Sequence, residues 1–293
     1  MKLSVIIPTL NAEKTLEPLL SALENQIQPP DEILIIDSSS TDWTAEIVKQ
    51  YPAVRFTVIP KESFNHGGTR DQAAQMSTGD VLLFMTQDAI PANNRLTETL
   101  VKALSDHPNA AAAYARQIPA QDANPREKLV RAFSYPEKTE IHDLRSVQQL
   151  GLRAYYCPNV CAAYKKEAYL ELGGFETDLR TNEDMLFAAK AIKAGKQIIY
   201  TADAEVIHSH NLSFGEQYRR NKLQGYELAK HRELLGDDSP VGTGKALLFY
   251  VTRGLLKQGH FFSWIGFGFD CIARYAGNRA GKRENESGKE KNG

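Results

Sequence analysis

The chain begins with a short apolar run that leads directly into a polar loop, LSVIIPTLNAE at residues 3–13. The pattern returns as EILIIDSSSTD at residues 32–42 and as VLLFMTQDA at residues 81–89. After the first run, leucines recur at helical spacing, at positions 16, 19, 20 and 23. Apolar strands that alternate with helices predict a sheet covered by helices on both faces. We therefore predict an α/β fold in which the sheet is mostly parallel.

The rest of the chain divides into a second α/β half and a helical C-terminal region. Residues 105–212 are less regular, and their strand-like runs lie at 110–115, 197–200 and 205–207. Residues 213–276 have a mainly helical pattern. The stretch 277–293 is rich in Gly, Lys, Glu and Asn, which predicts a disordered tail.

The composition is that of an ordinary globular protein with balanced charge. The 293 residues include 35 Lys and Arg against 36 Asp and Glu, a formal net charge of -1, and 42% of the chain is hydrophobic. A chain of this length can bury a large core, which excludes wholesale disorder. Without net positive charge it has no bulk attraction to nucleic acid, so any anionic ligand must be held by local groups.

The sequence carries no sign of secretion, of a disulfide framework or of a membrane span. Its 3 cysteines, Cys157, Cys161 and Cys271, cannot make a complete disulfide set or a zinc site. The N-terminal apolar run is too short for a signal peptide, and no run of about eighteen apolar residues occurs. We therefore expect a cytoplasmic protein with reduced thiols.

Polar residues follow the first strands, at the edge where α/β sheets bind their ligands. Asp37, with the Ser and Thr residues behind it, could hold a base or a ribose. Gly67 and Gly68 would let a backbone approach a ligand closely, and Arg70 stands near a helix start that favours an anion. Asp88 supplies a hard oxygen ligand for Mg2+ or Mn2+ on a diphosphate. Each feature alone also fits an ordinary turn or helix cap, so their joint order carries the prediction.

This order of motifs resembles the nucleotide-sugar domain of family 2 glycosyltransferases, which have the GT-A fold. The resemblance covers residues 1–210 and rests on SVIIPTLNAEKTLEPLLSAL, EILIIDSSSTDWTAEI, GDVLLFMTQDAIP, LGGF and NED. It implies a glycosyltransferase domain at 1–212, with a nucleotide-binding half at 1–104 and an acceptor half at 105–212, followed by a helical extension. The pair FNHGGTR and TQDA is similar to the bacterial branch that transfers rhamnose from dTDP-rhamnose to surface polysaccharides or lipid-linked sugars.

The resemblance also implies which residues bind the donor. Pro8, Thr9 and Glu13 match the base-binding loop, and Asp37 would contact the base. The other donor-site positions are His66, Gly67, Gly68, Arg70 and Gln87.

The metal site departs from the family pattern. The family's Asp-x-Asp falls on Thr86-Gln87-Asp88, so Asp88 is the one acid that remains. A histidine after the late strand could complete the set for Mg2+ or Mn2+, with His208 as first candidate and His210 as the alternate. Both could equally be loop residues with no ligand role.

The NED motif matches the family's catalytic base, with Asp184 as the base and Glu183 as its neighbour. A base near the acceptor hydroxyl and a metal on the leaving group together predict an in-line displacement with inversion. Two acids at a helix start would also suit the helix dipole without any catalytic role. We further predict that Asn159 and Gly174 lie near the acceptor.

Two other functions fit the same residues. One is a glycosyltransferase that uses a UDP-hexose donor, and the other is a non-catalytic module that binds nucleotide sugars or glycans. The segment 246–275 is rich in aromatic residues and interrupted by Arg and Lys. It could lie in a bilayer interface, where a lipid-linked acceptor would be found, or pack on the domain or on another subunit. The oligomeric state is left open.

Overall fold

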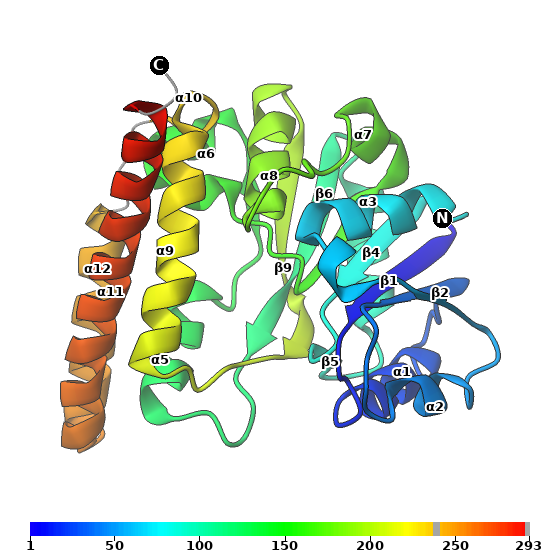
Figure 1. Cartoon of the computed structure of the whole chain (residues 1–293), viewed down its shortest axis with the longest axis horizontal. Helices are drawn as coiled ribbons and strands as arrows, with labels where there is room; N and C mark the ends of the chain where they lie inside the picture. The colour runs from blue at the N-terminus through cyan, green and yellow to red at the C-terminus, as the bar shows by residue number, and fades with distance from the viewer. Residues whose placement is uncertain (237–240, 291–293) are drawn as a thin grey trace.

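A mixed sheet of nine strands runs through the molecule, and helices cover both of its faces (Figure 1). The computed structural model describes residues 1–236 and 241–290. The strands are β1 (Leu3–Thr9), β2 (Glu32–Asp37), β3 (Val54–Val58), β4 (Val81–Met85), β5 (Ile90–Pro91), β6 (Ala110–Ile118), β7 (Glu140–His142), β8 (Cys161–Lys165) and β9 (Gln197–Ile207). Their order is β3-β2-β1-β4-β8-β6-β9-β5, and β7 pairs with β9.

The first half of the sheet is parallel, as predicted. β1 pairs in parallel with β2 and β4, and β2 pairs in parallel with β3. On one face, Val5 and Ile7 of β1 pack in one core cluster with the buried leucines of α1 (Leu16–Glu24). On the other face, Ile6 packs with α3 (His66–Met76) in a second cluster. Because successive residues of β1 enter opposite cores, the strand has to be apolar throughout.

The second half is mixed, which corrects the expectation of a mostly parallel sheet. β8 runs antiparallel to both β4 and β6, while β5 and β7 run antiparallel to β9. β6 and β9 are parallel to each other. β8 starts beside the end of β4, since Cys161 pairs with Met85.

The two short strands expected at 197–200 and 205–207 are one continuous strand, β9. Its register with β6 shifts between Thr201 and Glu205, so residues 202–204 form an irregularity in the pairing. This interruption explains why the sequence pattern breaks there. Beyond it, β9 carries the chain to His208 at the same edge of the sheet where β6 ends.

Helices follow the sheet and build one side of the molecule (Figure 1). They are α9 (Phe214–Lys230), α10 (Arg232–Leu235), α11 (Val241–Lys257) and α12 (Phe261–Glu290). β9 ends at Ile207, so the proposed division at 212/213 falls just before α9. α12 lies alongside α9, and α5 (Pro125–Ser134) packs against both α11 and α12. Within the described ranges, no helix has the length and hydropathy to cross a membrane.

The predicted disordered tail is wrong for residues 277–290, which continue α12. A Cβ at Gly277 would collide with the carbonyl of Tyr218, and one at Gly281 with the carbonyl of Lys222, both on α9. The glycines therefore allow two helix backbones to touch. Glu284 adds ion pairs of 2.7 Å to Lys222 and to Arg180. Residues 291–293 of the expected tail lie outside the described residues.

Candidate active site

Side chains assigned to donor binding tie together the ends of β1, β2 and β4. The carboxylate of Asp37 accepts hydrogen bonds from the Thr9 hydroxyl (2.8 Å) and from the amide (2.8 Å) and hydroxyl (2.6 Å) of Ser40. The Gln87 side chain accepts from the Leu10 amide at 2.8 Å and donates to the Leu10 carbonyl at 3.1 Å. The structure thus brings Thr9, Asp37 and Gln87 to one edge, where their polar atoms brace the loops.

The loops after β1 and β2 hold unusual backbone conformations. Asn11 and Ser39 have φ values of 51° and 57°, in the left-handed region that non-glycine residues rarely adopt. Asn11 follows the Pro8-Thr9 strand end, and its side-chain oxygen accepts from the Thr41 amide at 3.0 Å. Glu13 accepts from the amide of Trp43 at 3.3 Å. Such strain persists where surrounding contacts enforce it, and it concentrates at functional sites.

Asp88, His208 and His210 form a group that could hold a metal ion. Their candidate ligand atoms all lie within 4.8 Å of one another. His208 Nε2 is 3.6 Å from Asp88 Oδ1, and His210 Nε2 is 3.5 Å from Asp88 Oδ2. Both candidate histidines therefore face the one remaining acid. Their convergence from β9 onto the loop after β4 combines carboxylate and imidazole, donors that suit a divalent metal.

A second layer of contacts fixes the tautomer of His208. Its Nδ1 lies 2.9 Å from Gln117 Oε1, and Arg131 donates to the same oxygen. Because Arg131 can only donate, that Gln117 atom is the oxygen, and Nδ1 must carry the hydrogen. The lone pair of His208 then sits on Nε2, toward Asp88. Burial lowers the pKa of His208, so its imidazole is neutral, as a ligand must be.

Sequence analysis missed Gln117. It lies near the end of β6, directly after Arg116, and is 2% exposed. Because Arg116 beside it is also polar, the sequence alone does not distinguish the buried Gln117 from its half-buried neighbour.

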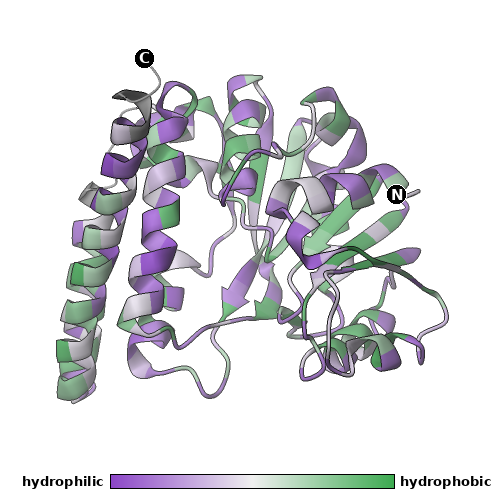
Figure 2. Ribbon diagram, in the orientation of Figure 1, coloured by the Kyte–Doolittle hydropathy of each residue, from purple (hydrophilic) through white to green (hydrophobic). Residues whose placement is uncertain are grey.

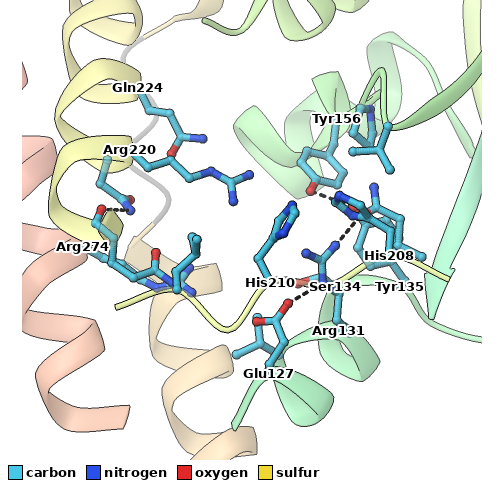
Figure 3. Close-up of a pocket in the computed structure, with 17 residues that line it drawn as sticks. Glu127, Arg131, Ser134, Tyr135, Tyr156, His208, His210, Arg220, Gln224 and Arg274 are labelled. Carbon is cyan, nitrogen blue, oxygen red and sulfur yellow. Dashed lines mark hydrogen bonds and ion pairs between the residues drawn. The ribbon is translucent and has the colours of Figure 1, made fainter. Parts of the chain in front are cut away.

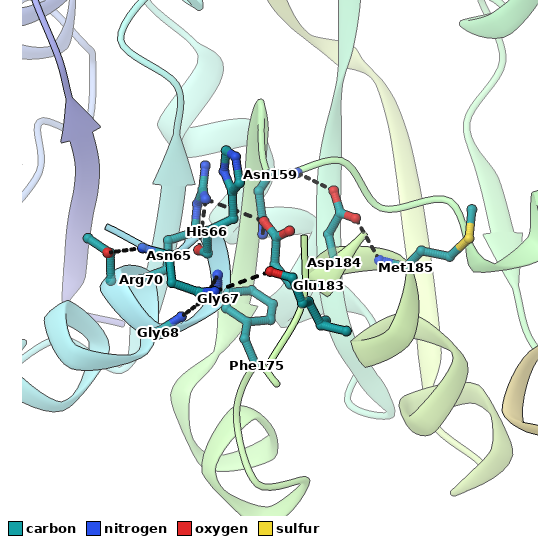
Figure 4. A network of polar contacts seen from close by, with 12 residues as sticks. Asn65, His66, Gly67, Gly68, Arg70, Asn159, Phe175, Glu183, Asp184 and Met185 are labelled. Atoms are coloured by element: carbon teal, nitrogen blue, oxygen red, sulfur yellow. Dashed lines mark hydrogen bonds and ion pairs between the residues drawn. The ribbon is translucent and has the colours of Figure 1, made fainter. Parts of the chain in front are cut away.

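The candidate base lies at the start of α8 (Glu183–Lys193), directly after Asn182 with its left-handed φ of 68°. Asp184 Oδ2 accepts from the Asn159 amide at 3.1 Å, and Oδ1 accepts from the Met185 amide at 2.7 Å (Figure 4). Burial, together with the charge of Glu183, outweighs these bonds and raises the pKa of Asp184 to about 7. A carboxylate with this pKa can take a proton at neutral pH.

Asn159 holds the two acids, which corrects the prediction that it contacts the acceptor. Its Nδ2 donates to Glu183 Oε1 at 3.1 Å, and its Oδ1 accepts from the Tyr164 hydroxyl at 2.8 Å. The residue is 3% exposed, so it has no surface to offer a substrate. Gly174 is likewise a buried turn, where a Cβ would collide with the carboxylate of Asp71. The glycine is thus needed for this packing, and its place near the acceptor stays a prediction.

Arg70 faces the acids and not the predicted nucleotide loops. Its Nη1 lies 3.3 Å from Glu183 Oε1 and donates to the His66 carbonyl at 2.9 Å. With 4% of its surface exposed, Arg70 neutralises Glu183 inside the protein. The His66 ring lies at 5.0 Å from the ring of Phe64, and its place in the sugar pocket stays a prediction.

Gly67 and Gly68 also serve the fold. Asn65 caps α3 by accepting from the amides of Gly67 (3.0 Å) and Gly68 (2.8 Å), so these donors are already used (Figure 4). The space above Gly67 is filled by the carbonyl of Glu176. At Gly67 the group that approaches the backbone is therefore the protein itself, and the predicted approach of a ligand to the two glycines stays a prediction.

The sequence of the chain is similar to those of known glycosyltransferases. Residues 4–173 match the family model described as Glycosyl transferase family 2. The chain belongs to glycosyltransferase family 2. It is 38% identical over 284 residues to the O-antigen chain rhamnosyltransferase WbaN of Salmonella anatum, which covers 95% of this chain and 89% of that protein. It is also 38% identical over 221 residues to RfbN of Salmonella typhimurium, another O-antigen chain rhamnosyltransferase, covering 75% and 70%.

Solved structures of glycosyltransferases share the fold. The mannosyltransferase PcManGT from Pyrobaculum calidifontis, in complex with GDP-Man and Mn2+, superposes with a TM-score of 0.62 at 20% identity, covering 94% of this chain and 86% of that one. TarS 1–349 from S. aureus with UDP-GlcNAc gives 0.57 at 19% identity, covering 99% and 92%. The predicted GT-A fold and glycosyltransferase class are confirmed.

Proposed function

We propose that this glycosyltransferase moves rhamnose from dTDP-rhamnose to a saccharide or lipid-linked acceptor in the synthesis of a bacterial surface polysaccharide, with inversion at the anomeric carbon. The observation that carries the donor is the 38% identity to WbaN across 95% of the chain. The paired acids at the start of α8 and the Asp/His group support catalysis over mere binding.

In the proposed reaction, Asp184 accepts the proton of the acceptor hydroxyl. The acceptor oxygen forms a bond to the anomeric carbon, and the bond from that carbon to the nucleoside diphosphate breaks on the opposite face. Two backbone amides keep the Asp184 oxygens oriented, and its pKa near 7 suits proton transfer at neutral pH. Arg70 and Asn159 hold Glu183, so that the second acid stays fixed beside the base.

Asp88, His208 and His210 would hold Mg2+ or Mn2+. When bound, such an ion stabilises the negative charge on the departing diphosphate. Two imidazoles beside one carboxylate favour Mn2+, because Mg2+ prefers oxygen ligands. His208 is the better ordered ligand, since Gln117 fixes its ring, while the side chain of His210 is 41% exposed.

A donor screen tests the proposal. Purified protein with Mn2+ would be incubated with dTDP-rhamnose, UDP-glucose, UDP-GlcNAc or GDP-mannose, and release of the nucleoside diphosphate measured with and without EDTA. We expect slow hydrolysis of dTDP-rhamnose that EDTA abolishes. Turnover of a UDP-sugar alone would establish the rival donor, and binding without turnover of any donor would establish a non-catalytic module.

We also propose that the C-terminal helices rest on an anionic bilayer. Exposed apolar side chains repeat along one face of α12, and others lie on the adjoining α11. Hydrophobic residues, green in Figure 2, recur along both helices. This C-terminal apolar face comprises Leu248, Phe249, Leu256, Phe262, Ile265, Phe269 and Ile272. Residues 241–283 carry seven Lys and Arg residues and a single acid, Asp270, in a chain with a net charge of -1. Apolar and basic groups together suit an anionic lipid surface.

Vesicle flotation distinguishes a bilayer from a second copy of the chain. Wild type should float with vesicles of phosphatidylglycerol and much less with phosphatidylcholine. Phe262→Ser combined with Ile265→Ser should abolish flotation, and Leu170→Ser, an exposed apolar residue on α7 (Lys166–Glu171), should not. If the double variant instead turns a dimer into a monomer by light scattering without changing flotation, the face is a subunit interface.

A further inference from the structure

A cavity of about 200 Å3 lies between α5, α9 and α12, beside the two histidines. On one side, Arg220 and Gln224 of α9 and Arg274 of α12 line it, and on the other side His208 and His210 do (Figure 3). One cavity therefore joins the C-terminal helices to the candidate metal group. Neither the donor loops nor the catalytic pair described above contributes to its lining.

Two arginines enter this cavity from the C-terminal helices: Arg220, which is exposed, and Arg274, which is half-buried. Among the described residues, neither Arg220 nor Arg274 has an ion pair within 4.0 Å, and Arg274 Nε is buried without a hydrogen-bond partner. Burial lowers the pKa of Arg274, the charges of Asp270 and Glu127 raise it, and the charge of Arg220 lowers it, so the two guanidinium groups repel each other. Two neighbouring cations without a protein partner are the arrangement that an anion stabilises.

Both nearby acids form their ion pairs with other arginines, although Asp270 Oδ1 is buried without a hydrogen-bond partner. Asp270 pairs with Arg126 at 3.1 Å, and Glu127 pairs with Arg131 at 2.7 Å. Arg131 in turn donates to Gln117, within the chain that orients His208. These acids attract Arg274, but neither lies within 4.0 Å of it. The arginines around the cavity therefore outnumber the acids, in a protein whose overall charge is close to zero.

We propose that this cavity binds the diphosphate through which the acceptor saccharide is attached to its lipid, an inference that rests on the proposed function. Guanidinium groups match phosphate oxygens with paired hydrogen bonds. Pro158 and Val160 also line the cavity, on either side of the Asn159 amide that holds Asp184. An acceptor anchored there would place its sugar close to the base. The lipid would leave toward α12, which also carries the C-terminal apolar face.

The donor's own diphosphate is the other possible source of such an anion. The loops predicted to bind the nucleotide follow β1 and β2, and in the sheet β4, which leads to Asp88, lies between these strands and β9, which leads to the histidines. A donor held at Asp88 would therefore meet the histidines from the side of β4, whereas the cavity lies on the side of α5, α9 and α12. This geometry favours the acceptor, and the experiment has to separate the two sources.

Binding of farnesyl diphosphate, a soluble lipid diphosphate, tests the proposal by calorimetry, with farnesol, pyrophosphate and dTDP as companion probes. We expect wild type to bind farnesyl diphosphate and dTDP at the same time and farnesol much more weakly. Arg220→Gln and Arg274→Gln should each weaken farnesyl diphosphate binding about tenfold to a hundredfold, because each removes charge-assisted hydrogen bonds. Binding of dTDP should not change. Arg219→Gln, an exposed neighbour on α9 that does not line the cavity, is the matched control.

Several outcomes would overturn the assignment. Competition between dTDP and farnesyl diphosphate, with both weakened alike in Arg220→Gln, would give the cavity to the donor. Equal binding by Arg220→Gln, Arg219→Gln and wild type would show that no anion is recognised there. If Arg274→Gln fails to fold, Arg220→Gln decides alone. Because binding is measured without turnover, failure of dTDP-rhamnose as donor leaves this test intact.

Discussion

Replacing Arg70 by Gln should move the pH dependence of transfer to higher pH. Arg70 Nη1 lies 3.3 Å from Glu183 Oε1, and the two side chains are only 5% and 8% exposed. Burial and the charge of Glu183 raise the pKa of Asp184 to about 7, while the charge of Arg70 holds it down. Removing the cation leaves only the hydrogen bonds from the Asn159 and Met185 amides to oppose the effects that raise the pKa of Asp184. The pKa of Asp184 then rises further.

The size of the shift follows from the contacts. An opposite charge a few ångströms away lowers a carboxyl pKa by about 1–3 units, and Arg70 faces Glu183 more directly than Asp184, so we expect about one unit. Asp184 accepts a proton only as the carboxylate, so the acidic limb of kcat/KM moves up by about one pH unit. At pH values below that limb the rate falls about tenfold. Glu183 also loses its buried partner, which costs about 3–5 kcal/mol of unfolding free energy.

The assay is a pH–rate profile on variants whose folding has been checked by thermal melting. Arg70→Lys keeps the charge, so its limb should match wild type. Glu183→Gln removes the repulsion on Asp184 and should move the limb to lower pH. The double variant Arg70→Gln with Glu183→Gln removes both buried charges and should recover most of the lost stability. Superposable profiles for folded Arg70→Gln and wild type would refute the coupling between Arg70 and the base.

Three further changes probe other parts of the structure. Asp184→Asn should reduce transfer by about 10²–10⁴-fold while calorimetry shows unchanged donor binding; full activity would exclude Asp184 as the base. Gln117→Leu frees the His208 ring and should weaken Mn2+ binding about tenfold to a hundredfold, measured by electron paramagnetic resonance, unless His208 is no ligand. Gly277→Ala should cost about 1–3 kcal/mol of stability by forcing α9 and α12 apart, whereas Gly268→Ala on the same helix meets open space and should not lower the melting temperature.

The first half of the fold follows from residue pattern alone. Apolar strands such as β1 alternate with helices such as α1, and every polar loop of that half stands at the strand edge where the pattern places it. The histidine pair and Asp88 also converge as the strand order implies. These predictions depend on the local periodicity of apolar residues and on the rule that parallel strands all end at the same edge of the sheet. Both can be applied to the sequence directly.

The parts that were missed depend on long-range contacts. Asn159 and Arg70 lie far from Glu183 in sequence, and the pattern does not indicate that both would be buried against that acid. The glycine-rich composition of residues 277–290 is typical of a disordered segment. The composition does not indicate that the glycines allow contact with a second helix. Likewise, Gly67 and Gly174 indicate close approach without indicating which group approaches.

The glycine contacts between α9 and α12 also set the size of the cavity. Arg274, Gly277 and Gly281 are spaced as one face of α12, and that face meets α9 where Arg220 projects. Where the backbones of α9 and α12 are in direct contact, no side chain lies between them that could change its rotamer. The two helices therefore cannot adjust their spacing to admit a larger group. The distance between α9 and α12, which carry Arg220 and Arg274, is therefore fixed. The cavity would therefore select acceptors by their size. A change in this selectivity would require changes in the side chains of α5 on the opposite side of the cavity.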